Sequence, residues 1–366
     1  MHRKTPPPHL NIENLRNAVG TVLRKSYIFW FFLIAITLNG CSEPLYKQQV
    51  YVFNTWAEVS IYGEDNKKSQ AVVGEVLHEF ERLQQMLHAW KPSELSQLNS
   101  ALSQKQSANV SPELAAILKD ATLLSMQSGG NFNPAIGKLI SLWGFHADEI
   151  KPVNPSKETI AALVRENPRM SDITLNDKTV SNANSAVQID LGDYAKVYAL
   201  DRAVQLLKTR GIKNALINIG GNIAAMGEKG TRPWKIGIQH PRQQGPIAML
   251  EIYDGETVAT AGDYQRYFER DGKRYCDIID SATGSPAQGV QAVTVVVKRG
   301  EHSSTLANAA TKPLFIGGQN KWREAAQRMG IETAMLIDAN GEIHITEPLN
   351  RRIEFRLPKP VVHEVP

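Results

Sequence analysis

The sequence predicts an α+β fold in which antiparallel strands outnumber parallel ones. Amphipathic helical patterns alternate with short, strongly apolar strands, without an internal repeat or a low-complexity tract. Residues 266–279 have the pattern of a β-hairpin with its turn at 270–273, and residues 290–298 have a strand pattern that consists mostly of valine. With 42% hydrophobic and 21% charged residues, the composition is that of an ordinary globular protein.

The length and the charge narrow the possible classes of protein. A chain of 366 residues exceeds one typical domain, so we expect either two subdomains or one large α+β unit. The net charge of +4 is small for this size, and the basic residues are scattered. Because no stripe of Lys and Arg follows one element, we expect no nucleic-acid partner.

The N-terminus has the pattern of a secretory signal. Arg24 and Lys25 precede an apolar run over 27–38, which is shorter than the roughly 20 residues that a spanning helix needs. The residues before Cys41 resemble a lipobox, so we predict that 1–40 are removed and that Cys41 carries a lipid. A short membrane anchor with an incidental cysteine is the alternative.

Lipidation at Cys41 would place the protein in the cell envelope. We expect a periplasm-facing lipoprotein, with the inner membrane as its anchor, although Ser42 is compatible with either membrane. Residues 41–49 are assigned to the lipidated cysteine and a polar tether. Cys276 then has no partner for a disulfide, so the core alone must stabilise the exported protein.

Apolar spacing predicts the elements of the first half of the mature chain. Apolar and polar residues alternate over 50–62, as in a strand. Apolar residues recur at helical spacing over 68–90 and 112–128, and Gly129-Gly130 is expected to end the second helix. The polar stretch 149–185 predicts a surface excursion.

The second half of the chain gives clearer patterns. A short strand is predicted over 187–191 and a buried strand over 215–219, with an amphipathic helix over 194–210 between them. The other predictions are strands around Ile236, 249–253, Val258, 334–337 and 342–345, and helices over 304–312 and 322–329. We place a domain of two interlocked subdomains at 50–350 and a C-terminal tail at 351–366.

The segment Asp190-Leu-Gly-Asp-Tyr-Ala-Lys196 lies where a strand is expected to end and a helix to begin. Free backbone N–H groups at such a position favour an anion, and Lys196 in the first helical turn could reach a phosphate. Helix capping by Asp193 beside a solvated lysine is the alternative.

Two further groups of residues are less specific indications of a binding site. Gly220-Gly221 follows a buried strand and would let the backbone approach a ligand, although any tight turn uses the same residues. Segments 257–264, 275–284 and 306–312 are rich in hydroxyl and carboxylate oxygens, which suit Mg²⁺ as well as ordinary turn chemistry. The sequence has no three-glycine dinucleotide fingerprint, phosphate loop, Gly-x-Ser-x-Gly elbow or zinc spacing.

In their order, these motifs resemble the FAD:protein FMN transferases, a family of periplasmic lipoproteins, from about Tyr51 to Glu347. The motifs that carry the resemblance are Phe53-Asn54-Thr55, Ala89 to Asn99, Gly129 to Pro134, Leu142 to Phe145, Ile189 to Asp201, Asn218 to Gly221, Pro233 to Pro241, Thr260 to Tyr264, Ile279-Asp280 with Thr283-Gly284, and Val293 to Val295. The resemblance implies a T-fold-like scaffold, mostly antiparallel, that binds FAD and Mg²⁺ in a cleft. It also implies transfer of FMN to a threonine of exported or membrane flavoproteins with release of AMP.

The resemblance also assigns site residues. The flavin-contacting positions are Phe53, Trp90, Asn131, Phe132, Asn133, Asp190, Lys196 and Ile278. The metal positions correspond to Asp193, Asn308, Thr311 and Lys312. Catalytic roles fall on Asp193, Lys196 and Asp277, the last at a position close to the reacting phosphate.

Several of these positions depart from the family's pattern. Asn308 replaces an Asp, Asp277 replaces a His, and Lys312 replaces a Thr whose role the adjacent Thr311 could take. If this segment is helical, positions 308 and 312 share a face, so Lys312 would point to where the metal is expected. The other departures are Asn54 for Gly, Asn133 for Asp, Val197 for Gly, and Ser281-Ala282 for Pro-Arg.

Two interpretations fit these departures. In the first, the site is relocated and active: Asp193 supplies the carboxylate that Asn308 lacks, and Lys312 neutralises the pyrophosphate directly. In the second, the site has decayed, and the protein still holds flavin but transfers FMN poorly or not at all. Loss of one catalytic charge slows a reaction by orders of magnitude, so an assay separates the two. A structural envelope lipoprotein without flavin is a separate, third alternative.

Overall fold

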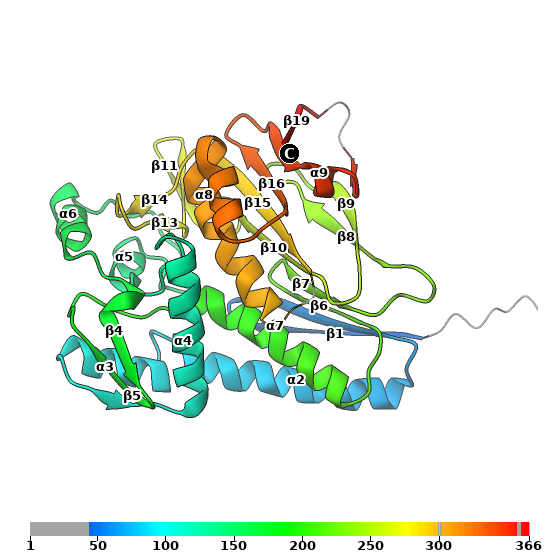
Figure 1. Cartoon of the computed structure of the whole chain (residues 1–366), viewed down its shortest axis with the longest axis horizontal. Coiled ribbons are helices and arrows are strands. Elements are labelled where there is room, and N and C mark those ends of the chain that lie inside the picture. The colour runs from blue at the N-terminus through cyan, green and yellow to red at the C-terminus, as the bar shows by residue number, and fades with distance from the viewer. Residues whose placement is uncertain (1–43, 299, 301, 357–359, 366) are drawn as a thin grey trace, which may run out of the picture. The chain divides into compact units, whose positions relative to one another are not determined.

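A nine-stranded sheet forms the centre of the computed structural model (Figure 1). The structure describes residues 44–298, 300, 302–356 and 360–365, and Pro44–Pro366 form one compact unit. Among the described residues, every neighbouring pair of strands in this sheet is antiparallel except β17 and β19. In spatial order the strands are β1 (Leu45–Val52), β2 (Thr55–Tyr62), β6 (Ala215–Ile219), β7 (Asn222–Met226), β10 (Thr257–Gly262), β15 (Val290–Val297), β16 (Thr333–Asp338), β17 (Ile343–Thr346) and β19 (Val362–Val365).

Three long helices cover one face of this sheet: α2 (Asn66–Leu87), α7 (Gly192–Thr209) and α8 (Ser303–Arg328) (Figure 1). A three-stranded antiparallel sheet covers the other face, in the order β18 (Ile353–Phe355), β9 (Pro246–Ile252) and β8 (Trp234–Gln239). In β15, Val293 and Val295 pack with the helices, whereas Ala292 and Val296 pack with the second sheet. Burial on both faces explains the run of apolar residues in this strand.

Smaller elements pack beside this layered core. The helices are α3 (Glu94–Ser103), α4 (Pro112–Gln127), α5 (Gly137–Leu142), α6 (Lys157–Glu166), η1 (Met170–Asp172) and α9 (Glu347–Asn350). The strands are β3 (Ala108–Asn109), β4 (Ile173–Asn176), β5 (Thr179–Asn182), β11 (Tyr267–Arg270), β12 (Lys273–Cys276), β13 (Ile279–Asp280) and β14 (Ser285–Pro286). Trp143 and Phe145 beside α5 pack on Phe268 and Tyr275 of the β11–β12 hairpin, and thereby fix the hairpin to the rest of the unit.

The α+β class with a predominance of antiparallel strands is confirmed. The helices predicted over 68–90, 112–128 and 194–210 correspond to α2, α4 and α7. The predicted hairpin is β11–β12, in which Arg270 pairs with Lys273. Cys276 is a buried free cysteine, as expected.

Several element predictions are wrong. Residues 50–62 form a hairpin rather than one strand, because Phe53 and Asn54 adopt positive φ values of 54° and 56° and reverse the chain. Residues 45–49 belong to β1 instead of a tether. The predicted strand 187–191 contains only an isolated bridge at Gln188, and the predicted tail contains β18 and β19.

Two further differences concern helices. The excursion 149–185 contains α6, η1, β4 and β5, and β5 also pairs with β3 from the earlier part of the chain. The helices predicted over 304–312 and 322–329 correspond to the two parts of α8, which the non-helical residue Gly318 (φ 58°, ψ −170°) separates; the first part extends beyond 312, through Pro313. Packing of α8 against β10 and β15 keeps its first part helical across Pro313, a residue that normally interrupts a helix.

The predicted signal at 1–40 and the lipidated Cys41 lie outside the described residues. Within the described part of the chain, no helix combines the length and the apolar character that a bilayer crossing requires.

Candidate functional site

A deep pocket opens where the β1–β2 turn, the end of α2 and the first turn of α7 meet. The segment after α4, the segment after β12 and Lys312 of α8 complete its wall. The pocket is lined by the predicted residues Phe53, Trp90, Asn131, Phe132, Asn133, Asp190, Asp193, Lys196, Asp277, Ile278 and Lys312. Segments that are distant in the sequence therefore meet at one site.

Aromatic side chains form one end of this pocket. Phe53 and Phe132 are buried in its wall, and the ring of Trp90 lies 5.1 Å from that of His146. The left-handed backbone at Phe53 directs this side chain inward toward Phe80 of α2, with a centroid distance of 6.3 Å. Such walls suit a planar, apolar ring system.

Asp190 links this aromatic end to the first turn of α7. Its Oδ2 accepts a hydrogen bond from Trp90 Nε1 over 2.9 Å, and its Oδ1 accepts one from the Gly192 N–H over 2.8 Å. Burial raises the pKa of Asp190, and these two hydrogen bonds partly oppose that effect. Because the N-cap of α7 has no side-chain hydrogen bond, Asp193 does not cap this helix.

Asp193 instead forms ion pairs with two lysines. Its Oδ1 lies 3.1 Å from Lys196 Nζ, and its Oδ2 lies 2.8 Å from Lys312 Nζ. Burial alone would raise the pKa of Asp193, but the two ammonium groups hold it well below its usual range. Two positive charges therefore share one carboxylate at the floor of the pocket.

Asn308 and Thr311 lie behind Lys312 and are buried. Lys312 Nζ donates to Asn308 Oδ1 over 3.4 Å and to Thr311 Oγ1 over 3.5 Å. Neither residue lines the pocket, although both were predicted as metal ligands. Their oxygens face the ammonium of Lys312.

Asp277 also lines the pocket, with its Oδ2 3.6 Å from Arg266 Nε. Burial and the negative charge of Asp193 raise the pKa of Asp277 to about 6, against the opposing charges of Lys196, Arg266 and Lys312. A carboxyl group with this pKa can exchange a proton near neutral pH.

Asn133 has a structural function as well as a place in the pocket wall. Its Nδ2 donates to the Pro168 carbonyl over 2.9 Å, and its Oδ1 accepts from the Ala135 N–H over 3.1 Å. The loop that carries Asn131 and Phe132 is thus held against the segment 167–170.

A second, more polar pocket adjoins the first, and both are lined by Asn54, Lys196 and Arg266. Its other lining residues include Thr55, Asn218, Gly220, Gly221, Thr260 and Tyr264. Gly220 has φ 58°, and a Cβ there would lie 2.9 Å from Thr55 Oγ1, so the Gly-Gly turn is needed for close packing.

The three oxygen-rich segments contribute unequally to the two pockets, since Asp277 and Lys312 line the first pocket. Thr260 lines the second pocket, whereas Asp280 accepts from the Ala282 N–H in a turn outside both pockets. The sequence did not indicate Arg266 and His146 as pocket residues, because no motif distinguishes them, and Phe145 was part of a family motif without being assigned to the site.

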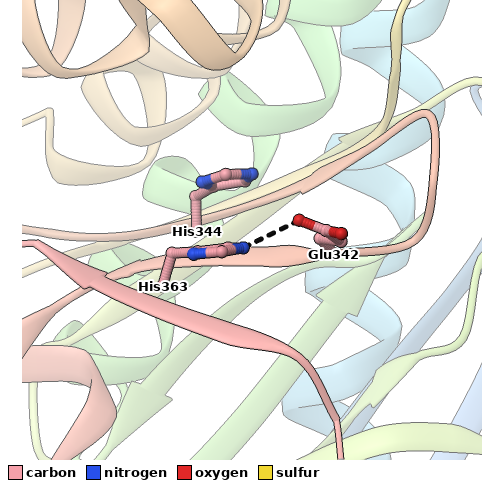
Figure 2. A group of neighbouring side chains, drawn as sticks. All are labelled: Glu342, His344 and His363. Carbon is pink, nitrogen blue, oxygen red and sulfur yellow. Dashed lines mark hydrogen bonds and ion pairs between the residues drawn. The ribbon is translucent and has the colours of Figure 1, made fainter.

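Glu342, His344 and His363 form a separate group at the β17–β19 edge of the central sheet, with one potential ligand atom from each within 4.8 Å (Figure 2). His363 Nε2 lies 2.7 Å from Glu342 Oε2, and His344 Nε2 lies 3.1 Å from Asp338 Oδ2. The two imidazole rings are stacked at 4.8 Å, so their in-plane lone pairs do not converge on one point.

Comparison with known proteins identifies the family of this fold and site. Residues 53–336 match the model of the ApbE family. An FAD:protein FMN transferase of Rhodobacter capsulatus is 36% identical over 85% of this chain and 59% of its own length. A second one, of Vibrio cholerae, is 31% identical over 84% of this chain and 93% of its own length.

Solved structures agree with the sequence comparison. The ApbE protein of Thermotoga maritima superposes with a TM-score of 0.76 at 27% identity, over 84% of this chain and 99% of that one. The flavin transferase ApbE of Vibrio cholerae superposes with a TM-score of 0.71 at 26% identity, over 84% of this chain and 100% of that one.

Proposed function

This chain belongs to the ApbE family, and we propose that it is an FAD:protein FMN transferase, as its relatives are named. The observation that carries the proposal is the junction of an aromatic pocket with a polar one at a cluster of lysines and carboxylates. FAD has the same succession of parts: an apolar ring system, a pyrophosphate and a polar nucleoside. The chain spans 59% of the Rhodobacter capsulatus relative but 93% of the Vibrio cholerae relative.

The aromatic end is suited to the isoalloxazine ring. Phe53 and Phe132 provide apolar walls, and the hydrogen bond between Trp90 and Asp190 holds the indole in place. The pyrophosphate would follow at Lys196 and Arg266, which line both pockets and carry positive charge. The adenosine part would then extend into the polar pocket beside Gly220-Gly221.

In the proposed reaction, the hydroxyl oxygen of an acceptor threonine attacks the phosphorus of the FMN half of FAD. A new P–O bond to threonine forms, the P–O bond to the AMP phosphate breaks, and AMP leaves. Asp277, which lines the same pocket, is the proposed acceptor of the hydroxyl proton, and its pKa of about 6 is consistent with this role. Lys196 and Arg266 offset the charge that develops on the phosphate oxygens.

The resemblance leads to the expectation of Mg²⁺ at Asp193, Asn308 and Thr311, but the residues present do not fit a divalent cation. Lys312 Nζ, a group without a free lone pair when protonated, lies among the oxygens of all three residues. We therefore assign no step of the reaction to a metal ion.

We also propose that the protein acts in the cell envelope on exported or membrane flavoproteins that carry an acceptor threonine. The support is the basic and apolar N-terminal segment followed by Cys41, which would carry the lipid anchor.

The alternative function is that of a flavin-binding lipoprotein without transferase activity. It is favoured by the replacements at Asn308 and Lys312, which remove the carboxylate and hydroxyl expected of a metal site. Both functions predict FAD binding, so only turnover distinguishes them.

The experiment uses the full chain in detergent with FAD and a randomised peptide library that has a central threonine. Transfer is measured as AMP release and as flavin fluorescence that stays with the peptides after denaturation. The same library with alanine at the central position is the control. Saturable FAD binding without AMP release above that control would reject the transferase and favour the alternative.

A further inference from the structure

Lys312 directs its ammonium group into the oxygen cluster in which a cation is expected. Its Nζ lies 2.8 Å from Asp193 Oδ2, 3.4 Å from Asn308 Oδ1 and 3.5 Å from Thr311 Oγ1. A metal ion coordinated by these residues would have to use the same oxygens. The lysine and a divalent cation therefore compete for one position.

The surrounding contacts favour this position of the ammonium. Asn308 and Lys312 are one turn apart on α8, and Asn308 Nδ2 donates to Asn222 Oδ1 of β7 over 3.3 Å, which turns Oδ1 toward the lysine. Thr311 Oγ1 donates to the Asn308 carbonyl over 2.6 Å and accepts from Lys312. Only 13% of the Lys312 side chain is exposed, and the residue lines the first pocket.

The local charges also disfavour a divalent cation at this position. Lys196 and Lys312 place two ammonium groups on the single carboxylate of Asp193, while the nearby carboxylate of Asp277 pairs with Arg266. Mg²⁺ requires nearly octahedral oxygen ligands at about 2.0–2.1 Å, and its charge would be repelled by both lysines. An anion such as a pyrophosphate, in contrast, is attracted there.

We propose that the ammonium of Lys312 takes the place of a divalent cation, so that this protein binds the pyrophosphate of FAD and releases AMP without a divalent metal ion. The inference rests on the proposed transferase function. The bonds made and broken are those of that reaction, with no change of oxidation state, and Lys312 acts only through its positive charge. Asp193 positions both lysines, and Lys312 contacts the phosphate oxygens.

The first test measures metal dependence of the full chain in three ways. FMN transfer to the threonine library and the FAD dissociation constant, from flavin fluorescence, are compared in EDTA and in excess Mg²⁺. Mn²⁺ binding in the presence of FAD is followed by electron paramagnetic resonance. We expect changes of less than about twofold in transfer and affinity, and no Mn²⁺ bound at this site.

The second test removes the ammonium. Lys312→Met should weaken FAD binding at least about tenfold and slow transfer at least about a hundredfold, because one buried charge is lost. Lys312→Thr combined with Asn308→Asp should lose the metal-free transfer and gain an Mn²⁺ signal. Lys321→Met, at an exposed position of the same helix, is the matched control and should behave as the unmodified protein.

The Glu342–His344–His363 group could bind Mn²⁺ independently, so its signal is subtracted by comparison with His363→Ala. Loss of transfer in EDTA with recovery in Mg²⁺ would overturn the inference and leave the transferase function intact. If no transfer occurs under any condition, the transferase function fails, and Mn²⁺ binding decides the inference. One Mn²⁺ bound with FAD, and lost in Asp193→Asn, would overturn it; no such ion, with FAD affinity that depends on Lys312, would support it.

Discussion

The indole N–H of Trp90 donates to Oδ2 of Asp190 over 2.9 Å and thereby joins two residues that are 100 positions apart in the chain. This bond connects the segment that follows α2 to the start of α7, and both segments line the aromatic pocket. The orientation of the indole thus depends on the carboxyl group of Asp190, which lies beside the charged residues of the pocket.

Trp90→Phe should weaken FAD binding about tenfold, because the ring remains but the hydrogen bond that orients it is lost, at a cost of about 1–2 kcal/mol. The measurement is a fluorescence titration with FAD. The midpoint of thermal unfolding serves as the control and should change little, since Trp90 is only half-buried. An unchanged dissociation constant would show that the hydrogen bond between Trp90 and Asp190 does not contribute to FAD binding.

The β1–β2 turn gives a prediction about backbone conformation. Asn54 has φ 56°, a value that Gly and Asn tolerate and that β-branched residues avoid. Asn54→Val should therefore lower the free energy of unfolding by about 1–3 kcal/mol, as measured by urea denaturation. Asn54→Gly is the matched control; if it destabilised the protein equally, the side chain rather than the backbone would be responsible.

The regular elements were predictable where their patterns are local. The helix over 194–210 has an uninterrupted apolar stripe, and it appears as α7. Residues 45–49 instead contain Lys47, Gln48 and Gln49, so their strand is stabilised by pairing with β2 rather than by an apolar pattern. Continuous helix across Pro313 depends on packing against the sheet, which single-sequence spacing does not contain.

The site was predictable in part: eleven of the residues that the family motifs assigned to it line one pocket. Helical spacing also indicated that Lys312 shares a face with Asn308, and their contact is observed. The distance between Lys312 and Asp193 could not be predicted, because it depends on how α7 and α8 pack. Arg266 was missed for the same reason: its place follows from the hairpin that carries it.

The ion pair between Arg352 and Glu256 gives a prediction about stability. Arg352 Nη1 and Nη2 donate to the two carboxylate oxygens over 2.9 Å and 2.6 Å, and Glu256 is almost fully buried. Glu256→Gln should lower the free energy of unfolding by about 3 kcal/mol, because the guanidinium loses its counter-charge. Denaturant titration is the measurement.

Two controls separate the buried charge from a general effect of substitution at this ion pair. Replacing both Glu256 and Arg352 with Met should cost less than Glu256→Gln alone, since no unpaired charge then remains buried. Glu354→Gln removes an exposed ion pair with Lys235 and should have no measurable effect. Equal losses for Glu256→Gln and Glu354→Gln would contradict the argument.

The last prediction concerns the pH dependence of FMN transfer. Because burial and the charge of Asp193 raise the pKa of Asp277 to about 6, this carboxyl group is protonated below that pH and cannot accept the hydroxyl proton. kcat/KM should therefore rise with pH, with an inflection near 6, and level off above it. Asp277→Asn should remove the inflection and slow transfer about 10²–10⁴-fold, while FAD binding is retained. A profile that keeps its inflection in Asp277→Asn would assign the titration, and the role of proton acceptor, to another group.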